Sequence, residues 1–512
     1  MLRHRWKILI GIALASIVLT GIELAMLGIG PKREVEAYKE SLIAKGEKLK
    51  ISELVPPPVP PEQNGADILN QAFTLLTPED QIYSNSIPAM RIIAPGKAIV
   101  CFEQPDVRNE HFTNSWKNDL AVVTDDQAMT ELMRQVMNCP AIDFHLNYED
   151  WAAADRYLGP LFFSANRLSA EAMCDLRQGD AAFAGTNISA ILAIVKGLND
   201  LRLNPFQQRR RITMTWLAAD TTWELLQSSN VSDGELSRLQ SSWEGPEYVH
   251  AMENAFAMER AFDESEILKM RASSKYFNDL TQGGEEDVDW SAGWRDAVDS
   301  LENNSKLACA KSMYRASWTY SDELGMLKKY GIILEMLRTV ETNQFFFPAY
   351  TRMTNELGIY EAGEPKDWLD DFDLHRMFSG AAFDQEVISL TVEAEATRRL
   401  AIAAISLKRY QLKHGNYPAS LANLEPQFVS PVPRDPIDGK PLRYRLMPDG
   451  SFLLYSIGEN GKDDGGDGSL TIRTWRDMPL RFAAPDALDW VWPQPATPAE
   501  IQAFYAHPRA IY

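Results

Sequence analysis

The sequence predicts a mainly α-helical protein with an N-terminal transmembrane helix, a large helical body and a small α+β module toward the C-terminus. Three observations support this fold class. Residues 8–30 form an apolar run with a single charge, residues 62–385 are dominated by apolar residues at helical spacing, and residues 386–478 combine one long helix with short alternating segments and turns. Because single hydrophobic cores stop growing near about 250–300 residues, a chain of 512 residues is expected to form more than one folded unit.

The overall composition is typical of a folded protein and argues against nucleic acid as a partner. Hydrophobic residues make up 45% and charged residues 24% of the chain, so there is enough apolar surface for a core. The net charge of −20 disfavours binding to a polyanion. The four cysteines lack metal-binding spacings, and most are expected to be buried as small apolar residues.

The first predicted element is an anchor within residues 1–30. Residues 8–30 carry only Glu23 as a charge, and as a helix they would span about 34 Å, enough for a hydrocarbon layer of about 30 Å. A cleaved signal peptide and a buried core helix are the alternatives. Basic residues flank the run on both sides, so charge alone does not fix its orientation. Because long domains translocate largely regardless of charge, we expect the N-terminus inside and the remaining chain outside.

The next predicted part, residues 31–61, is a charged stem followed by a proline-rich spacer. Residues 34–50 are expected to be helical, and residues 55–61 contain five prolines that must end the helix. In a polyproline II conformation these seven residues would reach about 22 Å. A simple helix break between packed segments is the other interpretation.

Residues 62–385 are expected to form an acidic helical domain. Residues 161–177 and 181–201 predict an antiparallel helix pair joined by a turn at 178–180. One face of the second helix is apolar, with Ile188, Ile191, Leu192, Val195 and Leu198. Further helices are expected at 207–227, from a capping box at Ser232–Glu235, at 246–271 and at 303–341, and residues 90–102 favour an extended segment.

Residues 386–478 predict a separate module. Its helix covers 386–414 and stops at Gly415, and a short helix is expected at 421–424. The segments 442–446 and 451–456 alternate apolar and polar residues across a turn at 448–450, which predicts a hairpin. The tail, residues 479–512, contains Trp490 and Trp492 and a terminal helix signalled at 497–500, and it is expected to dock back onto the body.

The order of motifs in this module resembles the globular domain of type II secretion pseudopilins. The matching pieces are His414-Gly415-Asn416-Tyr417-Pro418, then Asp435-Pro436 with Gly439 and Tyr444, then Leu454-Tyr455-Ser456-Ile457-Gly458-Glu459-Asn460-Gly461. The resemblance covers about 90 residues. It departs from the family pattern in having more than 350 residues before the module, which puts assembly into a pilus in doubt.

The whole chain also resembles a group of bacterial single-pass membrane proteins. This resemblance implies an exported body, held in the cell inner membrane by a signal anchor, with the bulk of the chain extracytoplasmic (periplasmic). Membrane lipid would contact the N-terminal helix, and an envelope protein would be the expected partner.

A calcium site is the only metal site that the module suggests. Major pseudopilins bind calcium in the loop that aligns with residues 460–471, and the candidate ligands here are Ser456, Asp463, Asp464 and Asp467 with backbone carbonyls. The chain lacks the family's downstream D-x-D pair in this loop, and the spacing is not that of an EF-hand. A solvated turn rich in glycine and aspartate is the alternative.

No catalytic motif points to a reaction. The sequence has no H-E-x-x-H, no G-x-S-x-G and no phosphate-binding loop. One acidic run could hold a divalent metal but is more typical of a solvated face: Asp367, Asp370, Asp371, Asp373 and His375. We therefore expect a membrane-anchored extracytoplasmic interaction or structural protein associated with a secretion or pilus-like system. A membrane-anchored hydrolase with an active site in the helical body is the alternative.

Overall fold

The computed structural model describes residues 29–77, 87–109, 113–125, 127–280, 306–308, 310–363, 381–469 and 488–506. Within them the fold is mainly helical with small sheets, as expected. The chain divides into two compact units. The first contains residues up to 55, 256–335 and 353–384, and the second contains 56–255, 336–352 and residues from 385 onward. Helices α10 (Tyr248–Ala272), α13 (Thr319–Asn343) and α14 (Ala349–Gly363) contribute to both units.

The expected transmembrane helix requires a correction. Among the residues that the structure describes, no helix is both long enough and apolar enough to cross a membrane. Residues 8–28 lie outside the described ranges, and the described residues 29–44 are helical with charged positions such as Lys32 and Glu36. The long helices elsewhere, including α13, carry charged side chains along their length. The prediction of a single-pass anchor is therefore wrong, and so is the inner-membrane, periplasmic location inferred from it.

The described secondary structure of the first unit consists of helices joined by turns. Besides its shares of α10, α13 and α14, it contains residues 29–44, α2 (Ile51–Leu54), α11 (Ser274–Leu280) and a π-helical turn (Tyr314–Trp318). The aromatic rings of Phe277 and Tyr314 stack at 5.9 Å between centroids in its core. The π-helical turn interrupts the single helix expected over 303–341, so α13 begins at Thr319.

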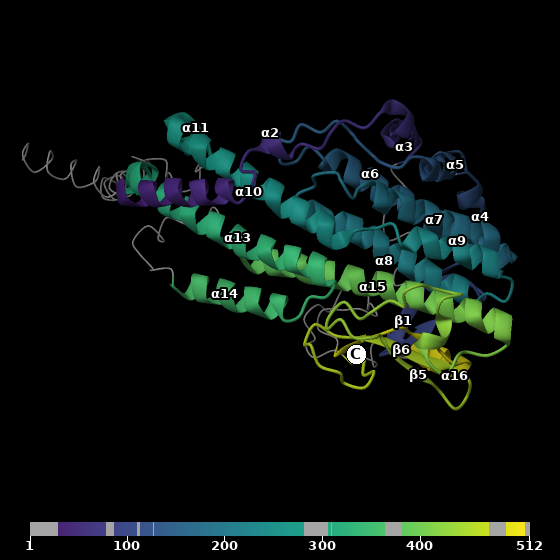
Figure 1. Ribbon diagram of the computed structural model, residues 1–512. Coiled ribbons are helices and arrows are strands. Elements are labelled where there is room, and N and C mark those ends of the chain that lie inside the picture. The colour runs from purple at the N-terminus through teal and green to yellow at the C-terminus, as the bar shows by residue number, and fades with distance from the viewer. Residues whose placement is uncertain are drawn as a thin grey trace, which may run out of the picture. The chain divides into compact units, whose positions relative to one another are not determined.

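The second unit is built around three long helices that lie side by side in Figure 1, α6 (Asp155–Gln178), α7 (Ala181–Gly197) and α8 (Pro205–Gln227). The apolar face predicted for the second of them is fully buried, as expected. The surrounding helical segments of this unit are η1 (Pro61–Gln63), α3 (Ala66–Phe73), α4 (Trp116–Asp125), α5 (Gln127–Gln135), η3 (Val136–Asn138) and α9 (Asp233–Trp243).

The turn between α6 and α7 has the form that the sequence predicts. Gly179 ends α6 in the left-handed conformation, with φ of 86°, which a residue with a side chain rarely adopts. The Asp180 side chain then accepts a hydrogen bond from the Phe183 amide at 3.0 Å and caps α7. The capping box at Ser232 and Glu235 is also present, at the start of α9.

Two small sheets lie near the start of the second unit. The expected extended segment forms the hairpin of β1 (Arg91–Ala94) and β2 (Lys97–Ile99), and β8 (Gln494–Pro495) from the C-terminal tail pairs with β2 in parallel. β3 (Val107–Arg108) and β4 (Thr113–Asn114) form a second, two-stranded sheet.

The C-terminal module contains α15 (Ala381–His414), η7 (Leu421–Leu424) and a three-stranded antiparallel sheet. β5 (Arg443–Leu446) pairs with β6 (Phe452–Ile457), which confirms the predicted hairpin, and β7 (Asp489–Val491) from the tail pairs with β6. Trp490 and Trp492 are buried, so the described part of the tail packs against the body as expected. The terminal helix α16 (Pro498–Ala506) begins with the predicted cap.

Candidate functional site

The motif residues of the C-terminal module converge on Asp435, which is fully buried. One carboxylate oxygen accepts hydrogen bonds from the Ser456 hydroxyl at 2.7 Å and the Ile437 amide at 2.9 Å. The other accepts from the Ile457 amide and the Arg443 guanidinium, both at 2.9 Å. Burial raises the pKa of Asp435, and these donors oppose that effect. Asp435 thus fixes the proline-rich turn to strand β6.

Arg443 links further acidic residues to the same point. Its guanidinium contacts Asp438 at 2.7 Å and Asp463 at 3.3 Å, in addition to Asp435. Despite some burial, the hydrogen bonds from Arg443 and Lys440 hold the pKa of Asp438 at about 2. A protein cation therefore lies among three carboxylates of the module.

The four predicted calcium ligands do not share one cluster of contacts. Ser456 donates to the buried Asp435, whereas Asp463 accepts from the Tyr455 hydroxyl at 2.8 Å and from Arg443. Asp464 accepts from the Asn460 amide at 2.9 Å, and Asp467 accepts from the backbone of Ser469 at 2.9 Å. Each therefore has a partner in the protein already, and the calcium site stays a prediction.

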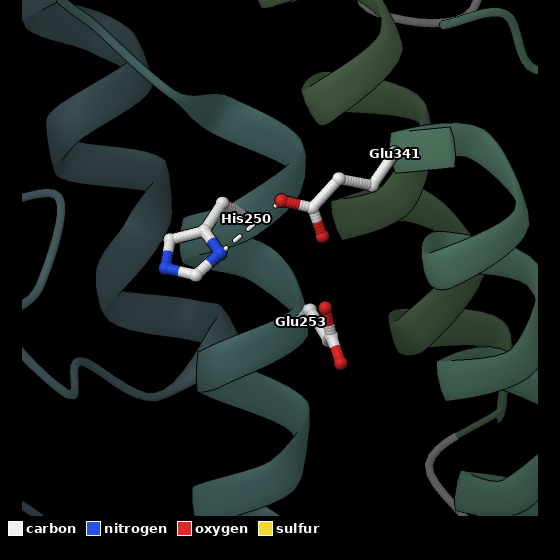
Figure 2. A group of neighbouring side chains, drawn as sticks. All are labelled: His250, Glu253 and Glu341. Atoms are coloured by element: carbon white, nitrogen blue, oxygen red, sulfur yellow. Dashed lines mark ion pairs between the residues drawn. The ribbon is translucent and has the colours of Figure 1, made fainter. Parts of the chain in front are cut away.

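A different group of metal-ligating side chains comes together in the second unit. Figure 2 shows His250 and Glu253, which lie one turn apart on α10, facing Glu341 near the end of α13. Their ligand atoms all lie within 4.8 Å of one another, and His250 Nδ1 is 3.3 Å from a carboxylate oxygen of Glu341. The three residues are partly exposed. This arrangement can bind a cation or hold a proton.

Neighbouring polar groups orient this cluster. Arg338 Nε donates to Glu253 at 2.6 Å, and the Asn254 side-chain amide lies 3.0 Å from His250 Nε2. Burial and the hydrogen bond with Glu253 raise the pKa of Glu341, while His250 lowers it. The two carboxylates are therefore close enough for one to favour the protonated form of the other.

Sequence reasoning did not find this group. His250 and Glu253 form an H-x-x-E pattern, which places both on one helix face, and that pattern is the available sequence signal. Glu341 lies on another helix far along the chain, and nothing in the sequence relates it to His250. The acidic run that sequence analysis did identify, Asp367 to His375, lies outside the described residues.

Several other charged side chains are buried in the second unit as internal links. Glu224 accepts backbone hydrogen bonds from Met90 at 2.7 Å and Cys101 at 2.9 Å, and burial raises its pKa to about 7. Arg134 contacts Glu171 at 2.8 Å. These groups tie helices to one another and to the β1–β2 hairpin.

The first unit contains its own buried charge network. Lys39 contacts both Glu264 and Glu323, and Arg271 also pairs with Glu323. Burial and the neighbouring Glu323 raise the pKa of Glu264 to about 7, so this carboxyl holds a proton more readily than usual. The network joins residues 29–44 to α10 and α13.

Comparison with protein-family models, with curated proteins and with solved structures finds no match for this chain.

Proposed function

We propose that this chain is an interaction or structural protein associated with a secretion or pilus-like assembly. The observation that carries the proposal is the set of hydrogen bonds among the three sequence pieces that resemble the pseudopilin motif. The Tyr444 hydroxyl donates to the Pro418 carbonyl at 2.7 Å, and Asp435 receives Ser456 and the Ile457 amide. The three pieces of the motif therefore meet in a single folded module.

The polar residues of the second unit support the same function. Glu395 pairs with Arg398 and Arg399 within α15, and Arg409 and Ser406 of that helix contact Gln240 of α9 at 3.1 and 3.2 Å. These side chains serve as links between elements. They hold the long helix of the module to α9, so any surface that the module offers to a partner is held in place.

Photocrosslinking in the native cell tests this proposal. A benzoylphenylalanine at Leu446 or Leu412, both 41% exposed on the module, should form one adduct of defined mass with a partner protein. Phe206, 53% exposed on α8, is the matched control position and should not give that adduct. Equal adducts at all three positions, or none, would reject the proposal.

A hydrolase acting through the helical body is the second candidate. It is favoured by one observation, the convergence of the His250 imidazole with the carboxylates of Glu253 and Glu341. Assays of the purified chain with chromogenic ester and phosphate substrates test this candidate. Hydrolysis by the wild type that is lost in Glu341→Gln would support this candidate. Equal rates of hydrolysis in the wild type and in Glu341→Gln would eliminate it.

A further inference from the structure

The spacing of the His250, Glu253 and Glu341 cluster fits one small metal ion. In a tetrahedral zinc site the ligand atoms lie about 2.0–2.1 Å from the ion, so two ligand atoms are about 3.4 Å apart. The distance from His250 Nδ1 to the nearest carboxylate oxygen of Glu341 is 3.3 Å. The third ligand, Glu253, has an atom within 4.8 Å of both, so binding of one ion would require the three side chains to draw closer together.

The surroundings of the cluster resemble the outer partners of metal ligands. Metal-binding histidines usually have their second ring nitrogen hydrogen-bonded, which fixes the ring. Here Nε2 of His250 lies 3.0 Å from the Asn254 side-chain amide, so Nδ1 is the nitrogen that faces the carboxylates. With Nδ1 on a metal, Nε2 would carry the proton and the amide would turn its oxygen to accept it. Arg338 holds one oxygen of Glu253, and the Glu253 carboxylate also approaches Glu341, the side from which a metal would be bound.

The charges in the cluster also favour a cation. Two carboxylates that approach each other repel unless a proton or a cation lies between them. The ligand atoms of Glu253 and Glu341 lie within 4.8 Å of each other, and the His250 imidazole lies beside them (Figure 2). A divalent ion would neutralise both carboxylates at once.

We propose that His250, Glu253 and Glu341 form a Zn²⁺ site that joins α10 to α13 in the second unit. The donor set favours zinc over calcium and magnesium, because zinc accepts imidazole together with carboxylates whereas calcium and magnesium prefer oxygen ligands alone. Three protein ligands leave the fourth zinc position for water. The zinc site does not rest on the proposed partner binding. Its three residues are also distant in the sequence from the predicted calcium ligands.

Calorimetric titration of the full chain with zinc chloride tests the site. The wild-type chain should bind zinc, and His250→Gln and Glu341→Gln should each weaken that binding by about 100-fold or more, since loss of an outer partner alone costs roughly 10–100-fold. His145→Gln is the matched control. His145 pairs with Asp143 at 3.2 Å and is 71% exposed, so it offers a histidine and a carboxylate without the third ligand.

The melting temperature and the spectrum of bound cobalt complete the test. Without metal, all variants should melt close to the wild-type temperature, and zinc should raise the melting temperature of the wild type and of His145→Gln alone. Cobalt in the site should show visible bands without the intense near-ultraviolet band of a thiolate ligand. Zinc affinity that is unchanged in His250→Gln and Glu341→Gln, or a thiolate band, would overturn the proposal. Neither result would alter the crosslinks at Leu446.

Discussion

At the scale of single residues, buried carboxylates have two opposite roles in the second unit. Glu395 is matched by Arg398 and Arg399, whereas Glu224 is held by the backbone amides of Met90 and Cys101. Burial disfavours the charged form in each case, and only nearby positive charge outweighs it strongly. The pKa of Glu395 is consequently lowered to about 2 by Arg398 and Arg399 despite its burial, while burial raises that of Glu224 to about 7.

Replacing Asp435 by Asn should destabilise the C-terminal module by about 3 kcal/mol, because it leaves Arg443 without its buried partner. Asp438→Asn is the matched control. Asp438 contacts the same guanidinium but is partly exposed, so its loss should cost about 1 kcal/mol. Urea unfolding of the full chain followed by tryptophan fluorescence measures both. Equal losses in the two variants would contradict the central role of Asp435.

The dependence of stability on pH should differ in sign between Glu224 and Glu395. Because the pKa of Glu224 is raised to about 7, its stabilising contribution is complete below pH about 4.5 and is lost as the pH rises through 7. Because the pKa of Glu395 is lowered to about 2, its contribution is complete above pH about 4.5 and is lost as the pH falls to 2.

Unfolding free energies measured from pH 2 to 8 test this difference. The advantage of the wild type over Glu224→Gln should shrink from pH about 4.5 to 7, and its advantage over Glu395→Gln should shrink from pH about 4.5 down to 2. Parallel curves for the wild type and Glu224→Gln across pH 4.5–7 would show that this carboxyl does not titrate as inferred.

At the scale of elements, two glycines of α7 differ in the space around them. Gly197, at the end of the helix, lies close to Ile142, whereas Gly185 does not. A Cβ at Gly197 would lie 2.7 Å from Ile142, whose amide bonds to the Gly197 carbonyl at 3.1 Å. Gly197→Ala should therefore cost about 1–3 kcal/mol. A Cβ at Gly185 would meet Leu225 at an ordinary 3.8 Å, so Gly185→Ala should stabilise the helix by about 0.5–1 kcal/mol. Chemical denaturation of both variants checks the opposite signs.

Elements set by local pattern could be predicted from the sequence, and those set by distant contacts could not. The spacing of apolar residues and the glycine at 179 were enough for α6 and α7, and turn chemistry was enough for the β5–β6 hairpin. The pairing of β7 with β6, and of β8 with β2, joins segments far apart in the chain. The same limit explains why His250 and Glu341 could not be related, and why Ser456, a predicted calcium ligand, instead donates a hydrogen bond to Asp435.

At the scale of the whole molecule, the prediction made from hydropathy was wrong for the transmembrane helix. An apolar run predicted a membrane-spanning helix, yet within the described ranges every long helix carries charges, and many of them pair inside a unit. Each unit has its own buried charge network, which fixes the packing of its helices. The proposed zinc site would add a further link between α10 and α13.

The measurement that tests this account most directly is the yield of the photocrosslinked partner at Leu446 in the wild type and in Asp435→Asn. The account predicts one specific adduct in the wild type, its loss in Asp435→Asn, and its retention in Asp438→Asn, because binding depends on a module held together at Asp435. A specific adduct that persists unchanged in Asp435→Asn, or the absence of any adduct specific to the module, would contradict it.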